Sequence, residues 1–192
     1  MSDTAERLSI TAEEYLQTEA HSAIKHEYIA GEIFAMAGAN ESHVTIALNL
    51  ATLLRSHVRG SSCRVYISDM KVNVDTADSF FYPDVFVTCD PRDVSEALMK
   101  RHPNLIVEVL SKSTAAYDYS AKFVYYQQLE SLQEYVLIKS DCMVIDVFRR
   151  DTEHEWVLYS FIAGDKIILT SIDFHCPIAD VYEDVLVDTC GH

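Results

Sequence analysis

Glycine and proline are scarce in this chain, which has five glycines and four prolines in 192 residues. Long flexible linkers are rich in such residues, so their scarcity favours a single domain over residues 1–192. Hydrophobic residues make up 49% of the chain and charged residues 23%, which is the balance of an ordinary globular protein. A disordered protein and a coiled coil are therefore poor interpretations of this composition.

Apolar runs of membrane-spanning length are also lacking, and we expect no secretory leader. No apolar run approaches the ~18 residues that cross a bilayer, and the first seven residues include acids where a signal peptide is apolar. The five cysteines are odd in number and show no CxxC spacing, which supports neither a disulfide framework nor a zinc knuckle. We therefore expect a soluble, cytoplasmic protein with reduced thiols and no membrane contact.

Basic residues are few, with 15 lysines and arginines against 30 acids and a formal net charge of −15. This balance argues against binding nucleic acid by a broad basic surface, but it leaves room for a local basic groove or for acids gathered around a metal. The excess is uneven, because residues 61–122 hold 9 acids and 7 bases whereas residues 123–192 hold 13 acids and 4 bases. The nearly balanced middle third also carries the residues that best suit chemistry.

The first sixty residues predict two helices and a hairpin. A capping-box pattern at residues 11–14 opens a short helix through about residue 19. Residues 25–36 alternate weakly about a glycine, which predicts a hairpin. Polar capping residues followed by apolar residues at helical spacing predict a longer helix over residues 40–60.

The rest of the chain predicts mainly strands. Residues 63–74 and 80–89 are rich in β-branched and aromatic side chains, which predicts two strands joined as a hairpin. Residues 93–101 predict a short helix, residues 105–110 a buried strand, and residues 113–129 a helical segment kinked near its start. Further strands are expected at residues 134–139, 143–149, 155–161 and 166–169. This order predicts an α+β fold in which helices flank a mixed sheet.

Three features of the middle third point to metal chemistry. Asp84 follows Pro83 within an apolar strand pattern, where a proline marks an edge or a bulge that can turn a carboxylate toward a site. Glu108 lies in an apolar run, and a buried carboxylate is costly unless it is paired or binds metal. Two carboxylates on neighbouring strands suit Mg²⁺, with Mn²⁺ as a substitute. Lys122 can orient or deprotonate a metal-bound water, or stabilise charge on a phosphate.

Each feature alone also has a purely structural explanation. A lone buried strand carboxylate more often forms an ion pair than binds metal, and Pro-Asp is common in turns. Asp118 and Lys122 are four residues apart on an expected helix, where they form an ordinary ion pair. The three features in this order carry more weight than any one of them.

These residues resemble the PD-(D/E)xK nuclease superfamily through Pro83-Asp84, Glu108 and a lysine. More specifically, the chain resembles the Uma-type family of restriction endonucleases. The likeness covers most of the chain. The stretches that carry it are residues 27–33, 68–72, 82–85, 103–111, 113–114 and 134–138, together with the single residues Met36, His43, Asp118, Lys122 and Tyr126. The combination is specific to this family, although no single stretch is.

The resemblance implies a restriction-endonuclease-like core over about residues 25–170, with an N-terminal helix and hairpin as an extension. It also implies an endonuclease that hydrolyses phosphodiester bonds of DNA with a Mg²⁺-activated water. By this resemblance Asp84 and Glu108 are metal ligands, the Val109 backbone carbonyl is a further oxygen ligand, and Lys122 has the lysine role.

One departure from the superfamily pattern concerns the lysine. The superfamily places it two residues after the glutamate, where this chain has Leu110. The lysine must come from elsewhere, so Lys122 on the following helix is the natural candidate and Lys112 is the runner-up.

Four further residues are candidates for supporting roles: His43, Asp69, Glu32 and Asp118. His43 opens a helix, from which it can partner a core carboxylate or act directly. Glu32 either approaches the metal from the hairpin or lies on the hairpin surface, and Asp69 precedes the Pro-Asp motif at the edge of the site.

The expected partners are DNA, bound weakly without metal, and a second copy of the chain. A homodimer follows because a small core that cuts both strands of a duplex needs two sites. Two other classes of function stay open at this point. One is a catalytically degenerate nuclease fold that binds or assembles, and the other is a metal-dependent hydrolase of a different phosphate ester.

Overall fold

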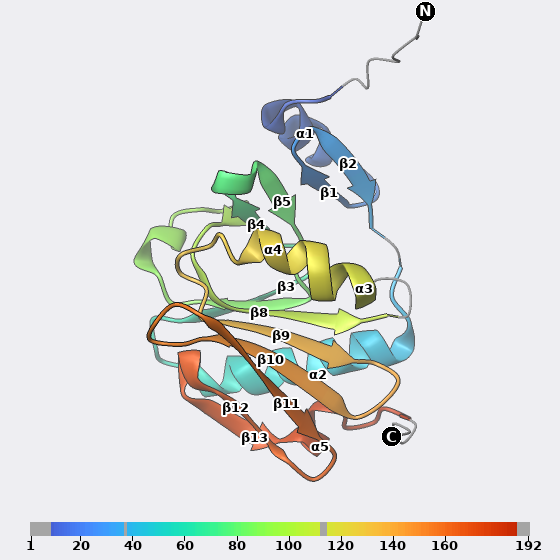
Figure 1. The fold of residues 1–192 in the computed structure, drawn as a ribbon. Coiled ribbons are helices and arrows are strands. Elements are labelled where there is room, and N and C mark those ends of the chain that lie inside the picture. Colours follow the sequence, from blue (N-terminus) through green and yellow to red (C-terminus); the bar gives the residue numbers. More distant parts are fainter. Residues whose placement is uncertain (1–8, 37, 112–114, 188–192) are drawn as a thin grey trace, which may run out of the picture.

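The computed structural model describes residues 9–36, 38–111 and 115–187, whose strands form two mixed sheets and a C-terminal hairpin (Figure 1). The six-stranded sheet has the order β11-β10-β9-β8-β6-β3 and the five-stranded sheet the order β2-β1-β5-β4-β7. The six-stranded sheet consists of β3 (Arg64–Ile67), β6 (Val85–Thr88), β8 (Pro103–Leu110), β9 (Glu134–Lys139), β10 (Val144–Arg150) and β11 (Trp156–Ile162). The other strands are β1 (His26–Ile29), β2 (Glu32–Ala35), β4 (Lys71–Val74), β5 (Ser79–Phe81), β7 (Met99–Lys100), β12 (Lys166–Leu169) and β13 (Phe174–Pro177).

Helices flank both faces of the six-stranded sheet (Figure 1). One face packs against α2 (Glu41–His57), the β12–β13 hairpin and α5 (Ile178–Val181). The other packs against a helical segment made of α3 (Ala115–Tyr117), a π-helix (Asp118–Lys122) and α4 (Phe123–Tyr126). Within the described ranges, no helix is long and apolar enough to cross a membrane.

The alternation of side chains along β8 decides which face each residue meets. Val107 and Val109 belong to the core cluster that contains α2, whereas Ile106 and Leu110 belong to the cluster that contains α4. Glu108 is two positions from both Ile106 and Leu110, so its side chain lies on the same face of the strand as theirs. Its carboxylate therefore points toward the π-helix side of the sheet. The fold thus places a charged residue beneath the helical segment that follows it in the chain.

The predicted N-terminal helix and hairpin are confirmed. Thr11 caps α1 (Ala12–Glu19), and its capping box with Glu14 is complete. The ring of Tyr15 stacks on the ring of Tyr28 in β1 with centroids 5.1 Å apart. Because β1 also pairs with β5, this extension joins the five-stranded sheet. The hairpin turn requires Gly31, whose φ is +95° and where a Cβ would lie 1.9 Å from the Ser9 hydroxyl oxygen.

The antiparallel pairing predicted for residues 63–74 and 80–89 is confirmed, because β4 pairs with β5 and β3 pairs with β6. The prediction of one continuous strand in each run is wrong, because each run contains two strands that belong to different sheets. A turn at residues 68–70 separates β3 from β4, and residues 82–84 separate β5 from β6. Pro83 has no N–H to continue a ladder, so the chain leaves one sheet and enters the other there. Asp84 therefore lies at the step between the two sheets.

The helix predicted over residues 93–101 is also wrong. A 3₁₀ turn (Pro91–Asp93) and the short strand β7 occupy this segment. The buried Asp93 carboxylate accepts the backbone N–H groups of Arg101 and His102 and the Thr88 hydroxyl, which ties the segment to the end of β6. A side chain that satisfies distant backbone groups in this way gives no periodic signal.

Other boundaries differ less. The kink expected near residue 117 is the start of the π-helix at Asp118, and the helical segment ends at Tyr126 rather than near residue 129. Strand β13 and helix α5 were not predicted. Strands β9 and β12 have the predicted bounds.

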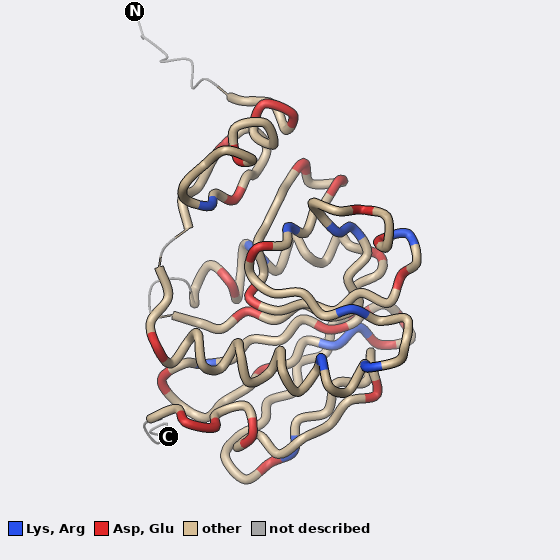
Figure 2. Tube along the Cα trace, turned by 180° about the vertical axis from the view of Figure 1, so that it is seen from behind, with Lys and Arg blue, Asp and Glu red and all other residues tan. Residues whose placement is uncertain are grey.

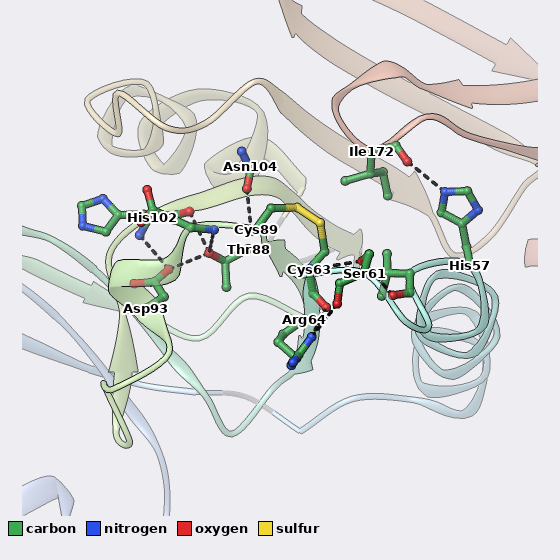
Figure 3. The surroundings of a disulfide bond; sticks show 12 residues. His57, Ser61, Cys63, Arg64, Thr88, Cys89, Asp93, His102, Asn104 and Ile172 are labelled. Atoms are coloured by element: carbon green, nitrogen blue, oxygen red, sulfur yellow. Dashed lines mark hydrogen bonds between the residues drawn. A yellow bond between two sulfur atoms is a disulfide. The ribbon is translucent and has the colours of Figure 1, made fainter.

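The expectation of reduced thiols is wrong for three of the cysteines. Cys63 and Cys89 form a disulfide (Figure 3). They lie one position beyond the paired residues Arg64 and Thr88, at matching ends of the antiparallel strands β3 and β6. Cys142 is disulfide-bonded as well, whereas Cys176 is a buried free thiol. A search for CxxC spacing could not reveal the first bond, because the bond joins the outer ends of two paired strands 26 residues apart.

Removing the Cys63–Cys89 disulfide should destabilise the protein. The bond closes a loop between positions 26 residues apart, so Cys63→Ala with Cys89→Ala is expected to lower the free energy of unfolding by about 3 kcal/mol. Urea denaturation without reductant measures this change. In the unfolded, unreduced wild type, a thiol reagent should label Cys176 but neither Cys63 nor Cys89. Labelling of both by mass spectrometry would show that the bond is absent.

Candidate active site

Glu108 lies in the middle of a buried strand, yet its carboxylate has charged and polar partners. The side chain is 6% exposed, and its Oε1 lies 2.9 Å from Lys122 Nζ. The Tyr126 hydroxyl donates a hydrogen bond to the same oxygen at 3.0 Å. Both partners come from the helical segment that covers this face of the sheet. The cost of burying the carboxylate is thereby offset by the layer above it.

Lys122 is the last residue of the π-helix and is as deeply buried as Glu108. Its Nζ lies 2.9 Å from Glu27 Oε1 in β1 and 4.0 Å from Asp118 Oδ1, in addition to its contact with Glu108. Three carboxylates from three parts of the chain thus surround one ammonium group. The ion cluster joins the N-terminal hairpin, the central strand β8 and the π-helix.

The charges in this cluster oppose the effect of burial. Burial alone would lower the pKa of Lys122, but the surrounding carboxylates, Glu108 foremost, outweigh it and hold the pKa above its ordinary value. Burial raises the pKa of Glu108 to about 8, with the Asp84 charge adding to the rise and the Lys122 charge opposing it. Carboxylates outnumber the ammonium here, so an additional positive charge would be stabilised.

Asp84 lies beside Glu108 at the step between the two sheets. Its Oδ2 accepts the backbone N–H of Val109 at 2.7 Å, which is the residue directly after Glu108. Its Oδ1 lies 2.9 Å from Nε2 of His43. Because β6 begins only at Val85, the Asp84 side chain binds the next amide along β8 in place of a ladder partner. The two predicted carboxylate ligands are therefore adjacent.

His43 supports Asp84 from the first turn of α2. Its backbone N–H donates to the Asn40 side chain, which caps the helix, at 2.9 Å. The helix start is thereby fixed, and the imidazole contacts Asp84 from a defined position. The structure places His43 as the partner of a core carboxylate, which is one of the two roles considered from the sequence.

The carboxylates open onto a groove of about 1510 Å³. It extends from the ion cluster along α2, with the N-terminal hairpin and the end of β3 as its other walls. The charged residues and the histidine at its inner end are Glu27, His43, Asp84, Glu108, Asp118 and Lys122. A substrate that fills this groove would reach both carboxylates and Lys122.

Asp69 and Glu32 do not belong to the ion cluster around Lys122. Asp69 lies at the rim of the groove, where its exposed side chain forms an ion pair with Lys25. Glu32 is paired with Ile29 at the turn end of the hairpin and does not line the groove. The pair of Glu32 with Ile29 lies two positions along the hairpin from the pair of Glu27 with Phe34. At the rise of ~3.3 Å per strand residue, two positions correspond to ~7 Å. Lys112, the runner-up for the lysine role, is outside the described residues.

The hairpin carboxylate that reaches the site is Glu27, which sequence reasoning did not select. Tyr126, the hydroxyl partner of Glu108, was also missed as a site residue. Glu27 is a charged residue in a short strand directly before the buried Tyr28, which is the same kind of signal that identified Glu108. Its significance depends on Lys122, whose approach only the folded chain reveals.

The donor set at the inner end of the groove fits Mg²⁺. Within the part of the chain that the structure describes, no group of three or more His, Cys, Asp or Glu side chains forms a metal cage. Mg²⁺ does not need one, because it keeps several waters and binds through one or two carboxylates together with substrate phosphates. Asp84, directly before β6, and Glu108, in the neighbouring strand β8, are two such oxygen donors. The ligand role of the Val109 carbonyl stays a prediction.

Loss of the Lys122 charge should leave buried carboxylates without compensation. Lys122→Met is expected to lower the free energy of unfolding by about 3–5 kcal/mol, since breaking a buried ion pair leaves an unpaired charge. Adding Glu108→Gln should restore part of the loss, so the two changes will not be additive. Urea denaturation of both single variants and the double variant gives the coupling. Lys166→Met, at an exposed position in β12, is the control and should change stability by less than about 0.5 kcal/mol.

Comparisons with known proteins agree with this fold. Two proteins of Synechocystis are similar over most of their length. "Uncharacterized protein slr1290" is 38% identical over 173 residues, covering 90% of this chain and 91% of that protein. "Uncharacterized protein sll1609" is 36% identical over 151 residues, covering 78% of this chain and 85% of that protein.

A solved structure from Anabaena variabilis, titled as a putative nuclease belonging to DUF820, superposes with a TM-score of 0.75. It covers 91% of this chain and 98% of the other chain at 19% identity, and this likeness confirms the predicted restriction-endonuclease-like fold of mixed sheet and flanking helices. The model of the Uma2 family, described as "Putative restriction endonuclease", matches residues 12–178. Because this match spans well over half of the chain, the protein belongs to the Uma2 family.

Proposed function

We propose that this protein is a Mg²⁺-dependent endonuclease that hydrolyses phosphodiester bonds of DNA. The observation that carries the proposal is the adjacency of Asp84 and Glu108 at the inner end of a groove, with Lys122 buried against Glu108. Membership of the Uma2 family supports it, as does the fold shared with a structure titled as a nuclease. Mn²⁺ is a chemically acceptable substitute for the metal.

Each residue of the site has a defined part in this proposal. Asp84 and Glu108 would hold the metal, which when bound lowers the pKa of a water and neutralises phosphate charge. Lys122 keeps its proton because carboxylates surround it, so its role is to donate hydrogen bonds to the water or to a phosphate oxygen rather than to act as a base. His43 and the Val109 amide fix the orientation of Asp84.

Cleavage assays test the proposal directly. Plasmid and single-stranded DNA are incubated with Mg²⁺ or Mn²⁺ and the wild type, Asp84→Asn or Glu108→Gln. Both substitutions are expected to reduce the cleavage rate at least about 100-fold, because each removes a metal-binding oxygen charge. Calorimetry should show a parallel loss of Mg²⁺ affinity.

The control is Glu130→Gln, at an exposed position away from the groove, which should cleave and bind metal as the wild type does. Cleavage that persists in Glu108→Gln would overturn the site assignment. A folded wild type that cuts none of the substrates would instead identify a catalytically degenerate member that binds or assembles.

A homodimer is part of the proposal. One copy of the described chain contains one such carboxylate pair, so cutting both strands of a duplex requires two copies. Light scattering at micromolar concentration should give twice the 21.8 kDa of one chain. A stable monomer over that range would contradict the dimer while leaving the single-strand chemistry intact.

A further inference from the structure

We propose that the α2 side of the groove binds one unpaired nucleic-acid strand, with Arg55 and Arg59 holding its phosphates at the end far from the carboxylates. The inference rests on the proposed function, because it concerns how a substrate strand reaches Asp84 and Glu108. It adds a binding site for the strand and a preference for unpaired nucleic acid over duplex.

One face of α2 forms a continuous wall of the groove. His43 stands at its first turn, in contact with Asp84. The wall then continues at helical spacing, and its members are Val44, Ala47, Leu48, Ala51, Thr52 and Arg55. Arg59 follows just beyond the helix end and also lines the groove. The helix therefore leads from the proposed reaction centre to a pair of arginines.

Among the residues that the structure describes, Arg55 and Arg59 lack the carboxylate partners that several other arginines of this protein have. Arg92, Arg101 and Arg149 each have a carboxylate within ion-pair distance. Arg55 and Arg59 are exposed, and neither has such a carboxylate among the residues with described positions. In a chain with 30 acids and 15 bases, two unpaired arginines in one groove are well suited to an anionic ligand. The last turn of α2 carries basic residues, and Figure 2 shows basic positions there as well as elsewhere on the tube, while acidic positions spread over the whole trace.

The distance between the two ends of the wall suits a polymer rather than a small phosphate ester. His43 and Arg55 are twelve residues apart in one helix, which corresponds to ~18 Å at 1.5 Å per residue. A strand with a rise of 3.4 Å per nucleotide covers this distance in about five nucleotides. A mononucleotide could not contact Asp84 and Arg55 together.

The middle of the groove favours bases over a duplex backbone. Its exposed apolar side chains include Val44, Leu48 and Ile67, which are 54%, 61% and 55% exposed, and Phe34 from the hairpin, which is 46% exposed. A duplex presents phosphates to such a surface and is bound through a broad basic face, which a chain of net charge −15 does not provide. Unpaired bases instead offer apolar faces that pack on aromatic and aliphatic side chains. In a homodimer, each copy would handle one strand.

Binding is best measured in a Glu108→Gln background, which keeps the strand intact. Fluorescence anisotropy with a labelled 12-nucleotide single strand, and with the same sequence as a duplex, should show at least about tenfold tighter binding of the single strand. Arg55→Ala with Arg59→Ala should weaken single-strand binding about tenfold. The slope of log affinity against log salt should also become shallower by about 1.4, which is two phosphate contacts at about 0.7 each.

Two matched controls separate charge from apolar contact. Lys166→Ala removes an exposed charge outside the groove and should leave the affinity unchanged. Leu48→Ser should weaken binding without changing the salt slope. Leu98→Ser, at a leucine that is 71% exposed and lies outside the groove, should change neither the affinity nor the salt slope. Circular dichroism of each variant verifies the fold.

The outcomes distinguish this inference from the proposed function. If the arginine variant binds like Lys166→Ala, or the duplex binds as tightly as the single strand, the inference is wrong, even if wild-type protein cuts DNA. If the wild type cuts nothing but binds single strands through Arg55 and Arg59, the inference stands and the nuclease proposal fails. Absence of both binding and cleavage overturns both.

Discussion

The buried ammonium group of Lys122 is the interaction on which the site depends. Its partners Glu27 and Glu108 come from the N-terminal hairpin and the central strand, and Asp118 comes from its own π-helix. None of these charges could be buried alone at a tolerable cost. Together they hold three separate segments in contact, so the position of the Glu108 carboxylate depends on the packing of all three.

The step between the two sheets explains how the Asp84 carboxylate reaches both the Val109 amide and His43. A carboxylate within a regular strand would point into one core or the other. Strand β5 ends at Phe81 and β6 begins only at Val85, so Asp84, which follows Pro83 in this gap, is free of a ladder and binds the Val109 amide through its side chain. The irregular geometry at the site is thus a consequence of one proline at the junction of two sheets. The π-helix that carries Asp118 and Lys122 is a second irregularity, and π-helical turns are frequent at functional sites.

The strongly acidic composition has a more specific meaning in the folded protein. Some acids, such as Glu134 and Asp93, are buried and satisfy backbone or arginine groups that fix loops. Others gather around Lys122, where their excess suits a divalent cation. The arginines at the far end of α2 are left to face solvent in the groove. The acids around Lys122 and the arginines beyond them are separated by most of the length of a helix, so these opposite charges are largely screened from one another.

Patterns between residues that are close in the sequence were enough to predict several helices and strands. The capping box at Thr11, the periodic apolar face after Asn40, and the bounds of β9 and β12 are all present in the folded chain. A charged residue in an apolar run likewise marked Glu108 as special before its partners were known. These signals depend on neighbours within a turn or a strand, and such neighbours are adjacent in the sequence as well.

Only the tertiary structure decided which distant segments meet. The Cys63–Cys89 bond depends on the exact register that places the outer ends of β3 and β6 side by side, and the division of two apolar runs between two sheets depends on the order of the strands. Glu27 became part of the site because β1 joins β5 and places its carboxylate against Lys122. Periodicity specifies which face of a strand is buried but not which strand lies beside it. For that reason the sequence identified the carboxylate and the lysine, while the fold supplied the residues that hold them together.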